Sequence, residues 1–322
     1  MENLREIKNR AQSNFSSELK AKLEDFVIKD KSAFITLIAE SSLEARKLEY
    51  LKLECEKKVK ELNYFQAVYV TFTIIEKKFK NIIAVTSCKG GVGKSTIASN
   101  LAITLNNLGC KIGILDADIY GPSIPKIFNL KEKPNVDKSK KILPLKFEGI
   151  EIISIGLMID EKKPIIWRGP MIQSALMQLV SEVKWSNLDF LIIDLPPGTG
   201  DPHLTLLQKL KVTHSLVVTT NDELALSDTR KGINMLIKLN VPITGVIENM
   251  SYFQTNNNDE KHYIFGEKGT EELCKEFNLK LLEKIPIYSQ KNFSVLDQKK
   301  EFLSKYYSNV GKIFNNLIKQ VN

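Results

Sequence analysis

Several residue types and patterns are scarce in this chain, and each scarcity excludes a class of protein. The 322 residues include four cysteines and no C-x-x-C pair, which argues against a disulfide framework and a local metal-ligand knuckle. Only five of the 46 Lys and Arg residues are Arg, so the net charge of +8 does not indicate nucleic-acid binding. No apolar run approaches the roughly 18 residues that cross a bilayer, and the N-terminus lacks the apolar stretch of a signal peptide. We therefore expect a cytoplasmic protein with reduced thiols, no stable membrane insertion and no nucleic-acid partner.

The remaining composition, 43% hydrophobic and 26% charged, is that of an ordinary globular protein. The hydrophobic pattern changes near residue 80 and predicts two domains, residues 1–78 and 79–322.

The first domain is predicted to be a small α+β unit. Ser32–Glu40 and Ala67–Ile74 read as strands on either side of a helix over Leu43–Leu62, after a polar helical lead-in from Met1 to about Phe26. Cys55 lies on the apolar stripe of the helix, and we expect it to be a core residue.

From Asn81 onward, apolar strands alternate with amphipathic helices. Strands are expected over residues 82–87, 111–116, 188–194, 215–220 and 242–248, and helices over residues 94–108 and 225–239. This alternation predicts an α/β fold with a doubly wound, mostly parallel sheet whose strand carboxyl ends share one edge. We interpret Leu130–Glu148, rich in Lys and Pro, as an exposed loop or hairpin insertion without chemistry of its own.

A glycine-rich segment, CKGGVGKST, follows one of these strands and opens a helix at Cys88–Thr96. This is the context of a phosphate-binding loop, because glycines let the backbone turn its N–H groups toward phosphate oxygens at a helix N-terminus. Lys94 is expected to neutralise phosphate charge, and Ser95 to offer its hydroxyl to Mg²⁺. Cys88 stands where the first glycine is usual, and we expect its thiol to be buried beneath the loop.

Two further segments place carboxylates at expected strand ends. Asp116 and Asp118 lie two residues apart in LDADIYGPS and face the same side of an extended backbone. Asp116 suits a water-mediated Mg²⁺ contact and Asp118 suits orienting or deprotonating an attacking water, although an Asp-capped turn fits the same pattern. Asp194 ends the apolar run of LIIDLPPGTGD, as in a Walker B strand, and would hold a second magnesium-linked water. The glycines after it would let a switch loop move with the γ-phosphate.

Five segments occur in the order CKGGVGKST, DADIYGPSIP, WRGPM, LDFLIIDLPPGTGD and GVIENMSYF. Together they resemble the Mrp/ApbC family of P-loop ATPases, iron–sulfur cluster carrier proteins related to the Nbp35 and Ind1 groups. The first motif alone also fits MinD-type and ParA-type ATPases, and WRGPM with DLPPGTGD narrows the resemblance to this family. It covers about Asn81–Asn322, while residues 1–78 resemble a shortened MIP18-like domain.

The resemblance implies nucleotide-binding roles for particular residues. It assigns ATP binding to Gly90, Gly91, Val92, Gly93, Lys94, Ser95, Thr96 and Asn249. The amide of Asn249 would contact adenine, since it can donate and accept hydrogen bonds in one plane. The resemblance also assigns the magnesium environment to Ser95, Asp116 and Asp194.

Lys89 resembles the signature lysine of the deviant Walker A class, whose members close ATP between two subunits. By that resemblance Lys89 would reach the nucleotide of the opposite protomer and, with Lys94 and Asp118, make up the catalytic set. A homodimer is implied.

The largest departure from the family follows GVIENMSYF, where the family carries a C-x-x-C whose thiolates bind a bridging cluster. By ungapped register Thr255 and Asn258 occupy those two positions, and neither is a thiolate. The iron–sulfur ligands are therefore unknown. Cys274, Cys88 and His262 are the alternatives, but we expect Cys274 to be a core residue and His262 to be solvated.

The sequence is consistent with three hypotheses about function. The leading one is a dimeric, Mg-ATP-dependent ATPase that carries iron–sulfur clusters to apo-proteins, and the second is a nucleotide-switched adaptor without the cluster. The third is a positioning ATPase of the MinD or ParA kind, whose apolar C-terminal stripe over residues 303–321 would lie on a membrane. We expect that stripe to dock on its own domain instead.

Overall fold

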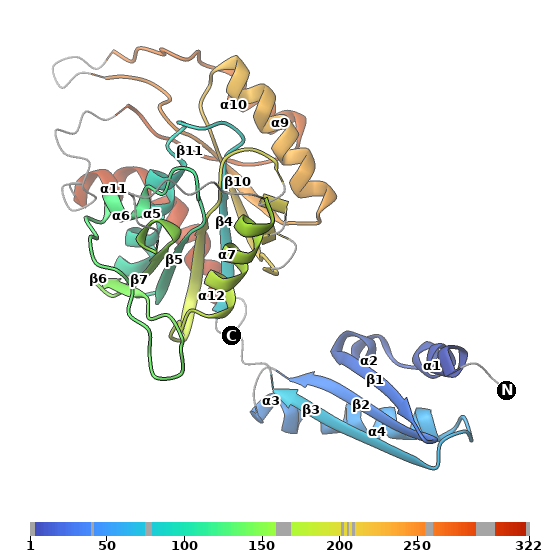
Figure 1. Cartoon of the computed structure of the whole chain (residues 1–322). Helices are drawn as coiled ribbons and strands as arrows, with labels where there is room; N and C mark the ends of the chain where they lie inside the picture. Colours follow the sequence, from blue (N-terminus) through green and yellow to red (C-terminus); the bar gives the residue numbers. More distant parts are fainter. Residues whose placement is uncertain are drawn as a thin grey trace. The chain divides into compact units, whose positions relative to one another are not determined.

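The computed structural model describes residues 4–39, 42–74, 79–158, 169–200, 203–204, 206–207, 210–254, 260–287 and 300–319 (Figure 1). The chain divides into two compact units, Met1–Lys77 and Lys78–Asn322.

The small unit is a three-stranded sheet in the order β1-β2-β3 with helices packed on it (Figure 1). Its elements are α1 (Leu4–Ser13), α2 (Ser17–Lys22), β1 (Leu23–Lys29), β2 (Ser32–Ala39), α3 (Ser42–Lys47), α4 (Glu49–Lys60) and β3 (Ala67–Ile74). Strand β2 pairs with β3 in parallel, as the predicted strand–helix–strand order requires.

The prediction of a helical lead-in as far as Phe26 is wrong, because β1 begins at Leu23 and pairs with β2 in antiparallel orientation. Asp30 and Lys31 form the turn between them, both with positive φ. Phe26 points into the core. The predicted helix over Leu43–Leu62 is two helices, α3 and α4.

The core of the small unit gathers apolar side chains from the helices and from one face of the sheet. Cys55 on α4 is fully buried there, which confirms it as a core residue. Burial raises the pKa of its thiol to about 12.

The large unit has an eight-stranded sheet in the order β11-β10-β9-β4-β8-β5-β7-β6. Its strands are β4 (Phe79–Thr86), β5 (Ile112–Asp116), β6 (Leu145–Phe147), β7 (Ile150–Ser154), β8 (Leu188–Asp194), β9 (His214–Thr219), β10 (Ile243–Glu248) and β11 (Leu281–Lys284). Every pairing among these strands is parallel except that of β6 with β7. The predicted doubly wound, mostly parallel sheet is confirmed.

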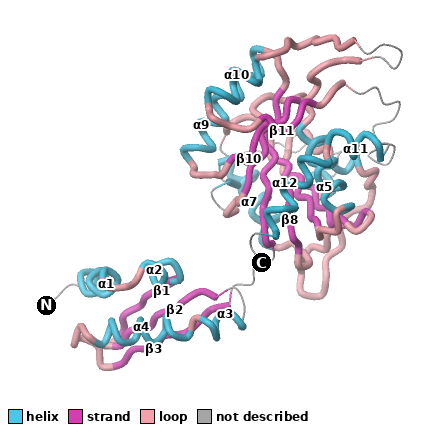
Figure 2. Tube along the Cα trace, turned by 180° about the vertical axis from the view of Figure 1, so that it is seen from behind, coloured by secondary structure: helices cyan, strands magenta, loops and turns pink. Residues whose placement is uncertain are grey.

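Helices cover both faces of this sheet. The helical elements are α5 (Lys94–Asn107), α6 (Ile124–Ile127), the 3₁₀ turn η1 (Ile155–Leu157), α7 (Gly169–Ser181), α9 (Glu223–Lys238), α10 (Gly269–Glu276), α11 (Lys300–Tyr306) and α12 (Ser308–Lys319). One buried apolar cluster joins the sheet to α5, α6, α11 and α12, and the other joins it to α7, α9 and α10. Figure 2 shows α5 and α12 side by side across the strands.

The Lys- and Pro-rich stretch Leu130–Glu148 ends in a hairpin, one of the two forms predicted for it. Strand β6 pairs with β7 across Glu148 and Gly149, whose positive φ values close the turn. Strand β7 was not among the predicted strands.

The C-terminal helix α12 packs on α5, as expected of its apolar stripe. Val310 and Phe314 are fully buried in the core cluster, and the Phe314 ring meets the ring of Phe190 from β8 edge-on. None of the helices in the described part of the chain is both long and apolar enough to cross a membrane.

Candidate functional site

The glycine-rich segment forms the connection from β4 to α5, as predicted. Gly91 and Gly93 have φ values of 82° and 86°, a left-handed conformation that side chains disfavour. Gly93 is the residue before the first turn of α5, and Lys94 begins the helix. The backbone N–H groups of this turn lack partners within the helix and can bind an anion.

Strand register brings three buried polar side chains into one row at the carboxyl edge of the sheet. Ser154 on β7 pairs in register with Asp116 on β5, and Asp116 pairs with Asp194 on β8. Neighbouring strands lie about 4.8 Å apart, and residues in register point to the same face. Two carboxylates and a hydroxyl therefore lie side by side where none is exposed to solvent.

Lys94 extends from the start of α5 into this row. Its Nζ lies 2.5 Å from Oδ1 of Asp194 and 3.7 Å from Oδ2 of Asp118. The lysine is itself buried, with 6% of its surface exposed. The structure thus brings together four residues predicted to act in one site, although they come from three separate segments of the chain.

The electrostatics of this cluster favour an additional cation. Burial, followed by the charge of Asp194, raises the pKa of Asp116. Burial also raises the pKa of Asp194, against the opposing effect of Lys94. One ammonium cannot neutralise three neighbouring carboxylates.

The donor set fits a magnesium ion. Oδ2 of Asp194 is buried without a hydrogen-bond partner, so it is an acceptor available to a metal-bound water. Mg²⁺ prefers oxygen ligands and keeps several of its waters, which suits carboxylates that contact it through water. Ser95, at the first turn of α5, would supply the hydroxyl oxygen.

Asp116 is held by three donors. Its Oδ1 accepts the N–H of Asp118 at 3.2 Å, and its Oδ2 accepts the Ser154 hydroxyl at 2.9 Å and the N–H of Ile124 at 3.3 Å. Sequence reasoning missed Ser154. The segment that ends in Ser154, IEIIS, is mostly apolar and was the available signal, but it carries no motif.

Asp118 has features of both of its predicted roles, the residue that orients an attacking water and the residue that closes a turn. Its Oδ1 accepts the N–H of Gly121 at 3.2 Å, which closes a turn, while its Oδ2 faces Lys94. The side chain is mostly buried. The turn therefore orients one carboxylate oxygen toward the cluster.

Lys89 lies at the rim of the loop and contacts its own chain. Its Nζ is 2.6 Å from Oδ2 of Asp222, and the same oxygen accepts the N–H of Ala225 as the N-cap of α9. The hydrogen bond from Lys89 lowers the pKa of Asp222. Both side chains are about one-third exposed, so the pair is accessible to solvent.

Asn249 follows β10 and packs against the loop. Its Nδ2 donates to the carbonyl oxygen of Val92 at 2.8 Å, and a Cβ added at Gly93 would overlap this amide. The side chain is buried. Asn249 therefore lies at the predicted nucleotide site, and its contact with adenine stays a prediction.

His203 contacts the strand that leads into the loop. Its Nε2 lies 3.1 Å from the hydroxyl oxygen of Thr86, the last residue of β4, and 1% of the histidine is exposed. Burial lowers the pKa of His203 to about 4, so the imidazole is neutral at physiological pH.

Comparison with known proteins identifies the family. Residues 78–322 match the family model described as ParA, NUBPL iron-transfer P-loop NTPase. This protein belongs to that family.

Two curated relatives illustrate the similarity. The chain is 51% identical over 210 residues to an iron–sulfur cluster carrier protein of Aquifex aeolicus, covering 65% of this chain and 58% of that one. It is 46% identical over 213 residues to the iron–sulfur cluster transfer protein NUBPL of Dictyostelium discoideum, covering 66% of each. The match thus spans less than two thirds of these relatives' lengths.

Solved structures share the fold. The nucleotide-binding protein of Archaeoglobus fulgidus, in complex with ADP, superposes with a TM-score of 0.58 at 35% identity over 74% of this chain and 89% of that chain. The cell division ATPase MinD of Pyrococcus furiosus superposes with a TM-score of 0.52 at 18% identity, over 74% and 99% of the chains.

Thr255 and Asn258, the two positions at which the resemblance predicts cysteines, lie outside the described residues. The backbone beside them pairs Phe253 with His262, and His262 is exposed. Within the part of the chain that the structure describes, no group of three or more His, Cys, Asp or Glu side chains is arranged to ligate a metal ion directly, so the carboxylates beside the loop would act on magnesium through water.

The alternative thiols differ in how deeply they are buried. Cys274 on α10 is buried in the core cluster, which confirms its predicted core role, and burial raises its pKa to about 11. Cys88 is half-buried, with its Sγ directed at Gly232 of α9, where an added Cβ would overlap it. Burial raises the pKa of Cys88 to about 11 as well.

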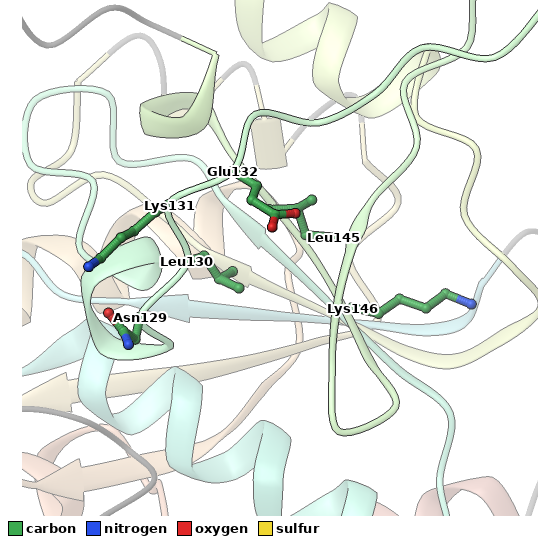
Figure 3. A pocket seen from close by; sticks show the side chains of 6 residues that line it. All are labelled: Asn129, Leu130, Lys131, Glu132, Leu145 and Lys146. Atoms are coloured by element: carbon green, nitrogen blue, oxygen red, sulfur yellow. The ribbon is translucent and has the colours of Figure 1, made fainter.

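A separate cavity of about 420 Å³ lies beside the β6–β7 hairpin (Figure 3). It is lined by Asn129, Leu130, Lys131, Glu132, Leu145 and Lys146. None of the predicted site residues contributes to it.

Proposed function

We propose that this protein binds and hydrolyses Mg-ATP and uses the nucleotide cycle to bind iron–sulfur clusters and transfer them to apo-proteins. The observation that carries the ATPase part is the buried contact of Lys94 with Asp194 beside a loop of phosphate-binding geometry. Family membership supports the cluster part. The ATPase would comprise residues 79–322, and residues 1–78 would be a shortened MIP18-like α+β domain.

The loop from Gly90 to Thr96 would hold the phosphates through its backbone N–H groups, with Lys94 neutralising their charge. Ser95, Asp116 and Asp194 would hold the magnesium ion, the two carboxylates acting through water. Magnesium, when bound, would withdraw charge from the β- and γ-phosphates.

Asp118 would orient or deprotonate the attacking water, because one of its oxygens is fixed by a turn while the other faces the site. Asn249 would contact the adenine. In a homodimer Lys89 would leave Asp222 and reach the partner's nucleotide, where its charge would offset charge that develops in the transition state.

The ATPase part is tested with Lys94→Ala and Asp118→Ala, each of which we expect to abolish ATP hydrolysis. The exposed pair Lys231 and Asp228 on α9 offers matched controls of the same residue types, and their alanine variants are expected to retain hydrolysis. Undiminished turnover in either site variant would contradict the assigned roles. ATP-dependent dimerisation is measured on the same samples by light scattering.

The cluster would be cargo rather than a resident cofactor, and the described residues offer no thiolate group that fits it. Anaerobic reconstitution with iron and sulfide tests carriage in the parent, in Cys274→Ser and in the matched control Cys110→Ser, another buried cysteine of the large unit. A stable cluster in the parent that only Cys274→Ser loses would support carriage through a relocated ligand.

A second candidate, a nucleotide-switched adaptor that has lost the cluster, is favoured by Thr255 and Asn258 at the cysteine positions. It would lead if the parent hydrolyses ATP and assembles no stable cluster. In either case the expected partners are apo iron–sulfur proteins or assembly factors, and the expected location is the cytoplasm.

A further inference from the structure

Ser154 is a buried hydroxyl at the predicted magnesium site that belongs to none of the sequence motifs. It is the last residue of β7, and it is fully buried. Strand register places it directly beside Asp116, on the side away from Asp194.

The hydroxyl of Ser154 has a defined direction. Its Oγ accepts the N–H of Gly156 at 3.0 Å, which occupies one lone pair. The hydroxyl proton is therefore free to point at Oδ2 of Asp116, 2.9 Å away. Ser154 acts as a donor to this carboxylate.

This bond fixes the plane of the Asp116 carboxylate together with two backbone donors. Oδ2 receives the Ser154 hydroxyl and, at a longer distance, the N–H of Ile124, while Oδ1 receives one N–H, that of Asp118. The less occupied oxygen keeps capacity to accept another donor, such as a metal-bound water.

We propose that Ser154 is a positioning residue of the magnesium–nucleotide site, which it serves by orienting Asp116 toward the waters of the ion. The proposal rests on the proposed Mg-ATP function. The effect of Ser154 would pass through the Asp116 carboxylate, to which its hydroxyl donates.

A purely structural role would consist of capping the η1 turn through Gly156. Loss of that cap would lower stability equally with and without magnesium. Loss of the bond to Asp116 would change how strongly magnesium supports nucleotide binding, so the two roles differ in a measurable quantity.

The experiment compares full-length parent, Ser154→Ala and Ser215→Ala. Ser215 is a matched control because it is also a fully buried serine of the same sheet, and its Oγ donates one bond, to the carbonyl of Pro242 at 2.8 Å. Binding of a fluorescent, non-hydrolysable ATP analogue is measured in EDTA and across a magnesium titration, and bound Mn²⁺ is measured by electron paramagnetic resonance.

In EDTA we expect Ser154→Ala to bind the analogue with the same affinity as the parent. In the magnesium titration the variant should need about tenfold more magnesium to reach half of the magnesium-dependent increase in affinity. A tenfold shift is the loss typical of a hydrogen bond to a charged group. Ser154→Cys keeps the volume with a weaker donor and should shift in the same direction. Ser215→Ala should match the parent.

A magnesium midpoint equal to that of the parent in both Ser154 variants overturns the positioning role. A parent whose binding of the analogue does not respond to magnesium overturns the proposed Mg-ATP function itself. The two failures are therefore distinct.

Discussion

The contact of α12 with α5 permits a sharp test of the packing. A Cβ at Gly311 would lie 2.7 Å from Cγ2 of Thr104 and 3.4 Å from Cδ1 of Leu108. Thr104 cannot rotate away without losing the bond from its hydroxyl to the carbonyl of Asn100, 2.8 Å long. We therefore expect Gly311→Ala to force the helices apart.

The magnitude follows from two opposing effects. Replacing glycine by alanine inside a helix favours the helix by about 1 kcal/mol, whereas overpacking a buried contact costs about 1–3 kcal/mol. Gly311→Ala should therefore lower the free energy of unfolding by about 1 kcal/mol. Thr104→Ser removes only the obstructing methyl group and keeps the hydroxyl, and in that background Gly311→Ala should stabilise by up to about 1 kcal/mol.

The assay is urea unfolding followed by tryptophan fluorescence. Both tryptophans, Trp167 and Trp185, belong to the large unit, so the signal reports that unit and not the small one. The parent and the three variants form a double-mutant cycle with an expected coupling of about 1–3 kcal/mol. Stabilisation by Gly311→Ala alone, or an equal loss in both backgrounds, would refute the reasoning.

Three further predictions concern titratable groups. Because the pKa of His203 is about 4 in the folded protein, the unfolded chain binds a proton more readily than the folded one, and the free energy of unfolding should fall by up to about 3 kcal/mol as the pH drops from about 6.5 to 4. Urea unfolding at a series of pH values should show that His203→Gln loses this pH dependence. An unchanged pH dependence in the variant would contradict the assignment to His203. Asp222→Ala removes both the N-cap of α9 and the partner of Lys89, whereas Asp222→Asn keeps a capping oxygen. The melting temperature should therefore fall further in Asp222→Ala than in Asp222→Asn. Equal falls in the two variants would place the effect in the ion pair and not in the cap. The raised thiol pKa values of Cys88 and Cys274 predict alkylation at least tenfold slower in the native than in the unfolded protein at pH 8. Mass spectrometry counts the alkylated thiols, and rapid labelling of the native protein would contradict the raised pKa values.

Much of the large unit could be predicted because its signals are local. The run of apolar residues before Cys88 and the glycines after it specify a strand, a turn and a helix from neighbouring residues alone. The strand over Leu188–Asp194 has the bounds that were predicted. The helix at residues 269–276 around Cys274 also follows from its local pattern.

Elements that depend on distant partners were missed. Phe26 lies in a short strand that alternates weakly, and its pairing with β2 decides its conformation. Strand β7 has no flanking motif, so Ser154 could not be recognised as a neighbour of Asp116.

The sequence by itself determined the phosphate loop, the alternation of strands and helices, and the residue types of the site, since these depend on glycine geometry and on apolar periodicity along the chain. Only the tertiary structure decided which of those residues meet. The row of Ser154, Asp116 and Asp194 is created by the order of β7, β5 and β8, and the bond of Lys89 to Asp222 joins residues 133 positions apart. Such contacts depend on strand order and register, which no local pattern encodes.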